Sequence, residues 1–184
     1  MSRFAWGLVC GAAGVLGVIG LAALAVVQFG LFDVRASTPH GPLATWAMHA
    51  TMIHVAQRGG ASVGPAPPIG PDDIQTGAAL YDQNCAACHG GPGLARARWA
   101  NGMTPSPPFL LDAARRWTRP QLFWIVRNGV KMTGMPAWSS TLSDGQVWDL
   151  AAFLEALPDL SPRAYARVKA AAVTPPPRPE TRIR

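Results

Sequence analysis

Charged side chains are scarce in this sequence. Only 14% of its 184 residues are Asp, Glu, Lys or Arg, while 49% are hydrophobic, and a typical soluble domain has about 25% charged residues. The net charge of +6 lies mostly in the flanks of the chain, because residues 72–169 carry ten basic and eight acidic side chains. A nucleic-acid-binding domain concentrates its basic residues on the folded part, so that class is excluded. The shortage of charge predicts a membrane segment.

The N-terminus supplies such a segment. No charged residue occurs between Phe4 and Val27, and a helix of that length spans roughly 36 Å, enough for a hydrocarbon core of about 30 Å. A cleavable signal peptide is the alternative, with a weak cleavage site at 34–36, but its apolar region would be only about 7–15 residues long. We therefore expect residues 1–35 to be an N-terminal transmembrane anchor. Arg3 favours the cytoplasmic side for the amino terminus, which places the rest of the chain outside.

Glycine and proline recur in the sequence after the anchor. Residues 36–71 are expected to form a short helix at the membrane interface, beginning at Pro42 and ending at Gly59–Gly60, followed by a Gly/Pro linker. The C-terminal residues 170–184 are expected to form a disordered, basic, proline-rich tail. Residues 72–169 remain as the folded domain.

Cysteine is also scarce, and its placement is informative. Cys10 lies within the apolar N-terminus, and only Cys85 and Cys88 are close together, in "NCAACHGG". A disulfide between them would close a very small loop and stabilise little. A thioredoxin-like dithiol requires a βαβ context that this sequence lacks, and structural zinc needs four ligands where Cys85, Cys88 and His89 supply at most three.

Covalent haem attachment is the interpretation that remains. Two thiols separated by two residues can add to the two vinyl groups on one porphyrin edge, and the following histidine then reaches the iron, which makes C-x-x-C-H a strong signal. The sequence therefore predicts one haem c bound to Cys85 and Cys88, with His89 as an iron ligand. Attachment of this kind takes place outside the cytoplasm, in agreement with the orientation inferred from Arg3.

The second axial ligand must come from further along the chain, where no histidine follows His89. Met135 is the candidate, because Gly134 and Pro136 flank it in an irregular segment that can hold a thioether rigidly. Met132 is the alternative, although methionine is commonly a filler of cores, and Met103 is expected to be a packing residue. A His/Met pair raises the reduction potential and leaves no open position on the iron.

Helix signals recur through residues 72–169, and no strand is evident. We expect one helix from Asp72 or Asp73 to about Ala86, and a second beginning with the capping box Thr118-x-x-Gln121. The last is expected to begin at Ser143 and to end at Pro158, because its apolar residues recur at intervals of three and four.

These pieces together resemble a class I monohaem cytochrome c. The resemblance rests on Gly77-x-x-x-Tyr81 before "CAACH", then "PSPP", "IVRNG", "GMPAW" and "VWDLAAFLEALP", and it covers less than half of the chain. It implies an all-α, single-haem cytochrome c fold following the transmembrane helix, with its first and last helices crossing near Gly77, Tyr81 and Phe153. It also implies that a proline carbonyl within 105–108 accepts a hydrogen bond from the His89 ring. A ring of lysines around the haem edge, seen in some relatives, is missing.

The expected function is one-electron transfer on the periplasmic side of a bacterial inner membrane. The chain would act as a carrier or as a subunit of a respiratory or dehydrogenase complex, with redox proteins as partners and no catalytic residues of its own. The small residues at Gly7 and Gly11 favour the subunit, because they allow close packing of transmembrane helices. A haem peroxidase or a ligand sensor with a labile methionine is the alternative.

Overall fold

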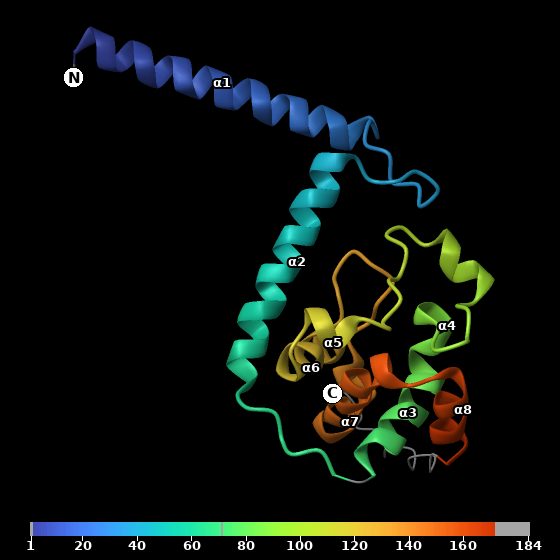
Figure 1. Ribbon diagram of the computed structural model, residues 1–184. Coiled ribbons are helices and arrows are strands. Elements are labelled where there is room, and N and C mark those ends of the chain that lie inside the picture. Colours follow the sequence, from blue (N-terminus) through green and yellow to red (C-terminus); the bar gives the residue numbers. More distant parts are fainter. Residues whose placement is uncertain (1, 71, 172–184) are drawn as a thin grey trace, which may run out of the picture. The chain divides into compact units, whose positions relative to one another are not determined.

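The computed structural model describes residues 2–70 and 72–171, and within these ranges regular structure is entirely helical. The chain divides into two compact units, the first ending at Thr38 and the second beginning at Pro39. The predicted all-α fold is confirmed. The α-helices, labelled in Figure 1, are α1 (Arg3–Gln28), α2 (Pro42–Val63), α3 (Asp73–Asn84), α4 (Ala86–His89), α5 (Ala113–Arg116), α6 (Arg119–Asn128), α7 (Asp144–Ala156) and α8 (Pro162–Ala171). Short 3₁₀ helices are η1 (Arg98–Gly102), η2 (Trp138–Ser140) and η3 (Leu157–Asp159).

Helix α1 makes up most of the first unit. It has 26 residues and contains an 18-residue stretch with a mean hydropathy of 2.4, so it is long and apolar enough to cross a membrane. Its N-cap is Ser2, whose hydroxyl accepts a hydrogen bond from the amide of Ala5. Its large apolar side chains are exposed to the surroundings, as expected of a helix whose solvent is lipid.

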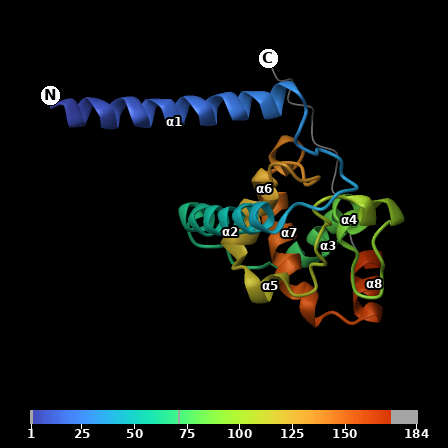
Figure 2. The ribbon, with the colours of Figure 1, turned by 90° about the horizontal axis from the view of Figure 1, so that it is seen from above.

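The crossing of α3 and α7 forms the centre of the second unit (Figures 1 and 2). Gly77 allows this close approach, because a Cβ atom there would lie 2.7 Å from Cβ of Phe153 and would also collide with the backbone of Asp149. One helical turn later, the rings of Tyr81 and Phe153 lie 5.2 Å apart between centroids. Both side chains are fully buried, so the crossing expected from the resemblance is present.

Two predicted helix starts are confirmed in detail. Thr118 and Gln121 form a capping box at the beginning of α6, and Ser143 and Gln146 form another at the beginning of α7. Each box satisfies amide groups that have no partner within the helix. Helix α3 ends at Asn84, two residues earlier than expected, because the backbone turns at Cys85 before α4 begins.

The helix expected to begin at Pro42 does so, but its expected end at Gly59–Gly60 was wrong. Helix α2 runs through both glycines to Val63 and packs along α6, as Figure 2 shows. A Cβ atom on Gly59 would collide with the indole of Trp124, and one on Gly60 would lie 2.5 Å from Cγ of Gln121. The two glycines are therefore packing positions where the helices touch, and α2 belongs to the same compact unit as the helices after it.

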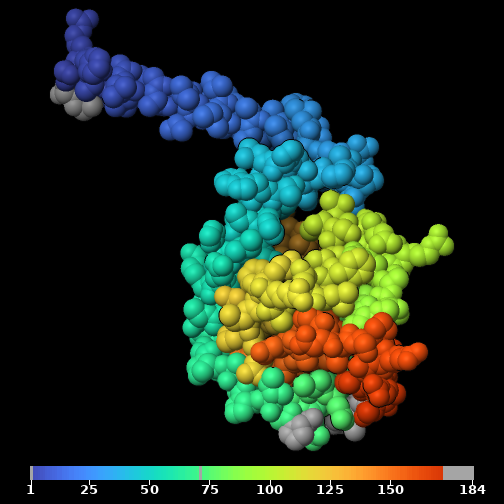
Figure 3. All heavy atoms as spheres, viewed as in Figure 1, coloured from blue at the N-terminus to red at the C-terminus, as the bar shows by residue number. Residues whose placement is uncertain are grey.

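The sequence interpretation also missed α8. It begins at Pro162 after a turn through η3, and it packs on α3 (Figure 3, red atoms against green). Its Tyr165 is 4% exposed, and the ring lies edge-on to Tyr81 at 6.5 Å between centroids. The tail predicted over 170–184 lies outside the described residues, apart from its first two residues, which belong to α8.

Candidate haem-binding site

Cys85, Cys88 and His89 share a single turn of backbone. Cys85 caps the end of α3, and its carbonyl oxygen accepts hydrogen bonds from the amides of Cys88 at 3.0 Å and His89 at 2.9 Å. Both thiols are free and half-buried. Burial raises the pKa of Cys85 to about 12, and the neighbouring Cys88 adds to this shift.

The ring of His89 is fixed by the loop that follows it. Nδ1 of His89 lies 2.7 Å from the carbonyl oxygen of Pro108. A carbonyl oxygen only accepts hydrogen bonds, so Nδ1 carries the proton and the lone pair of Nε2 is free to bind a metal. The proline carbonyl that the resemblance implied is therefore Pro108. Burial lowers the pKa of His89; the hydrogen bond to Pro108 raises it and the positive charge of Arg96 lowers it again, so the net shift favours the neutral, metal-binding imidazole.

Arg96 braces the segment that carries this carbonyl, a role that sequence reasoning did not identify. Its guanidinium donates to the carbonyl of Pro107 and to the hydroxyl of Ser106, and it lies 4.0 Å from the centroid of the Phe109 ring. These three contacts, on the two residues before Pro108 and the one after it, hold the Pro108 carbonyl toward His89. Nothing in the local sequence indicates this, because the contacts depend on residues 105–109 folding back over Arg96.

Met135 lies in a short loop that closes on itself after α6. The amide of Val130 donates to the carbonyl of Met135, and the hydroxyl of Thr133 accepts from the Met135 amide at 3.1 Å. At the end of α6, Gly129 has φ 65°, and a Cβ atom there would lie 2.5 Å from the carbonyl of Pro136. The side chain of Met135 is half-buried and packs against the same core cluster as Cys85.

The other candidate methionines have different surroundings. Met132 is 77% exposed and has φ 61°, so its side chain points out of the loop. Met103 packs against Gly134, where its terminal methyl occupies the space that a Cβ atom would need. Met135 thus packs against the core, Met103 packs against Gly134 in the loop of Met135, and Met132 is exposed to solvent.

The donor set of this turn fits covalently bound haem. It offers two free thiols and an imidazole with a free Nε2, and the loop that holds His89 carries large apolar side chains that are exposed: Leu94, Trp99, Phe109 and Leu111. Such side chains suit the apolar face of a porphyrin. Within residues 2–70 and 72–171, no group of three or more His, Cys, Asp or Glu side chains is placed to hold a metal ion directly.

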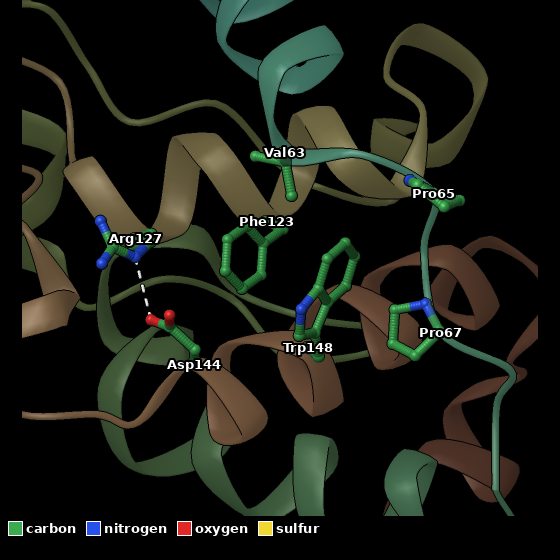
Figure 4. Close-up of a pocket in the computed structure, with 7 residues that line it drawn as sticks. All are labelled: Val63, Pro65, Pro67, Phe123, Arg127, Asp144 and Trp148. Atoms are coloured by element: carbon green, nitrogen blue, oxygen red, sulfur yellow. Dashed lines mark hydrogen bonds and ion pairs between the residues drawn. The ribbon is translucent and has the colours of Figure 1, made fainter.

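A separate pocket of 530 Å³ lies elsewhere in the second unit (Figure 4). It is lined by the end of α2 and the linker after it, by Phe123 and Trp148, whose rings stack 4.2 Å apart, and by the ion pair of Arg127 with Asp144. None of the cysteines, histidines or methionines of the site described above contributes to it. The pocket therefore has no part in binding haem.

Fold and site together define a monohaem c-type cytochrome domain, which carries one haem c attached covalently. Residues 72–154 match the family model described as "Cytochrome C oxidase, cbb3-type, subunit III", a match that covers less than half of the chain. Neither the curated proteins nor the solved structures contain a match. The predicted cofactor and the resemblance to monohaem cytochromes c are confirmed, whereas α1, α2 and α8 lie outside the matched segment.

Proposed function

We propose that this protein is a membrane-tethered carrier of single electrons, in which His89 and Met135 are the two axial ligands of the iron. The observation that carries the proposal is the turn of Cys85, Cys88 and His89 with the imidazole held by Pro108 at 2.7 Å. When bound, haem c supplies a one-electron couple between ferrous and ferric iron. Nε2 of His89 is oriented for the iron by its opposite nitrogen, as is usual for metal-binding histidines.

Met135 is proposed as the second ligand because its loop is closed by hydrogen bonds and its side chain packs inward. A thioether ligand favours the ferrous state and raises the reduction potential. With both axial positions filled, the site exchanges electrons and does not bind a substrate. The peroxidase or sensor alternative would require Met135 to leave the iron, and no contact in the loop favours this.

We further propose that the haem domain lies on the periplasmic side of a bacterial inner membrane and works as a subunit of a membrane-bound oxidase complex. Support for the complex comes from the matched family, whose description names a subunit of an oxidase. Support for a fixed position comes from α2, because its packing on α6 leaves only residues 29–41 to join the membrane helix to the second unit. Thirteen extended residues reach about 45 Å at most, which limits how far the second unit can move from the end of α1.

The experiment is solubilisation of membranes from cells that express the full chain, in a mild detergent, followed by purification and identification of co-purifying subunits. We expect a haem that stays bound after denaturation, a low-spin spectrum with a methionine–iron band in the red, and stoichiometric oxidase subunits. Purification of the chain alone would reject the subunit role and leave a mobile tethered carrier. A high-spin spectrum would reject His/Met ligation.

A further inference from the structure

The turn that follows His89, residues 90–94, has few internal interactions that stabilise its conformation. It contains three glycines, of which Gly90 and Gly93 have φ of 66° and 70°, conformations that L side chains rarely adopt. Its internal hydrogen bonds are the pair between Gly91 and Leu94, both at 2.9 Å. Glycine-rich backbone has much conformational freedom to lose, so packing from outside must supply the order at this position.

Two tyrosines from different helices provide that packing. The hydroxyl of Tyr81, on α3, donates to the carbonyl of Gly90 at 2.7 Å. The ring of Tyr165, on α8, lies over Gly91 so closely that a Cβ atom there would be 3.1 Å from Cε1 of the ring. The hydroxyl of Tyr165 is buried and has no hydrogen-bond partner, so this residue acts on the turn through its ring.

Helix α8 makes a second contact with the turn at its first residue. A Cβ atom on Gly93 would lie 2.8 Å from Cβ of Pro162. At its other end, α8 is tied to α3 by an ion pair of 2.7 Å between Lys169 and Asp82. Helix α8 is therefore tied to α3 near its C-terminal end and contacts the turn at its N-terminal end.

We propose that α8 is a clamp that positions His89, with Tyr165 and Pro162 as its positioning residues. The clamp holds Gly91 and Gly93, while Tyr81 holds Gly90, the residue bonded directly to His89. Together with the Pro108 bond, it thereby limits movement of the imidazole, and a ligand set that does not rearrange suits rapid electron exchange. The inference rests on the proposed role of His89, but it concerns a helix outside the segment matched by the family model.

The alternative is that α8 only adds stability, which the experiment must distinguish. Three variants of the full chain, isolated with haem attached, are compared: Tyr165→Leu, Tyr165→Phe and Leu122→Ala. Leu122 is 4% exposed on α6, which packs on α2 and α7, so its truncation destabilises the core without touching the turn. Readouts are the melting temperature, deuterium uptake of the peptide covering 90–95, the midpoint potential, and the g values of ferric haem, which report imidazole orientation.

We expect Tyr165→Leu to raise deuterium uptake in 90–95 several-fold and to shift both the potential and the g values. Tyr165→Phe keeps the ring and should match the unmodified protein, because the hydroxyl has no partner. Leu122→Ala should lower the melting temperature without these changes. If Tyr165→Leu differs from Leu122→Ala in melting temperature alone, the clamp is rejected, and if uptake rises while potential and g values stay constant, positioning of His89 is rejected.

Pro162→Ala provides the same comparison if Tyr165→Leu does not accumulate. It removes the ring atoms near Gly93 and leaves Tyr165 in place, so we expect smaller shifts in the same direction, and their absence would reject the clamp. Failure of the proposed function is recognised separately, because the unmodified protein would then lack the low-spin histidine signature against which every variant is measured.

Discussion

Gly60 of α2 lies so close to Gln121 of α6 that a Cβ atom on the glycine would be 2.9 Å from Cα of the glutamine. The two helices are therefore in close contact at this point, with the backbone of α6 near the glycine. This contact joins the segment after the membrane helix to the cytochrome domain. Its removal would lengthen the connection from residues 29–41 to residues 29–71.

Gly60→Val should separate α2 from α6. Overpacking of a close helix contact costs about 1–3 kcal/mol, so we expect a lower free energy of unfolding, measured by chemical denaturation in detergent. Ala61→Val is the control, because Ala61 is exposed on the same helix. Valine is a better helix former than glycine and a poorer one than alanine, so propensity alone predicts a more stable Gly60→Val and a less stable Ala61→Val. A Gly60→Val protein at least as stable as the unmodified protein would show that the α2–α6 contact contributes nothing.

Arg96→Lys should loosen the segment that holds the His89 ring. Lysine keeps the positive charge but lacks the planar guanidinium, which stacks on Phe109 while its Nη1 donates to both Ser106 and Pro107. We expect a shift of the midpoint potential and broader ferric signals, measured by redox titration and by electron paramagnetic resonance. Arg98→Lys, at an exposed position two residues away, should change neither the potential nor the ferric signals. An identical result for both variants would show that Arg96 does not help to hold the His89 ring.

Local signals account for what could be predicted from the sequence. The capping boxes at Thr118 and Ser143 involve residues three apart, so their chemistry is complete within one turn of helix. The attachment motif is equally local, because Cys85, Cys88 and His89 lie on one turn. Gly77 and Tyr81 were placed through the resemblance, and the crossing with Phe153 follows from it.

The remaining features depend on residues far apart in the sequence. Gly59 and Gly60 carry the same local signal whether they end a helix or lie against another one, and only the position of α6 decides between these. Ser161–Pro162 is a local start signal for α8, but Pro158 just before it was interpreted as the end of the last helix. The role of Arg96 requires a loop to fold back over it, which no spacing in the sequence reveals.

Substitution of the methionines should separate the three candidate ligands. Met135→Ala should abolish the methionine–iron band and lower the midpoint potential, because a thioether ligand favours ferrous haem. Met132→Ala should keep both, since this side chain is exposed. Met103→Ala removes the contact with Gly134, so we expect the band to persist with a shifted potential. Loss of the band in Met103→Ala or Met132→Ala, but not in Met135→Ala, would overturn the assignment.

Asp149 gives the fold a dependence on pH. It lies half-buried on α7, and burial raises its pKa to about 6, with a further contribution from the negative charge of Asp73. In the unfolded chain an aspartate has a pKa of about 3.9. The folded state therefore holds its proton more tightly, and the stability that this provides is complete below pH 4 and is lost as the pH rises through 6.

Asp149→Asn should remove this dependence. The amide cannot ionise, so at pH 7 the free energy of unfolding of the variant should be about 1 kcal/mol higher than that of the unmodified protein. This value is smaller than the full pKa shift implies, because the group is partly exposed and screened. At pH 4 the two proteins should be equally stable, since Asp149 is then protonated in the folded state. The measurement is thermal unfolding of the haem-containing protein at half-unit intervals from pH 4 to 7. Asp159→Asn, at an exposed position after α7, is the control, and a parallel offset of Asp149→Asn at every pH would show that ionisation of Asp149 is not the cause.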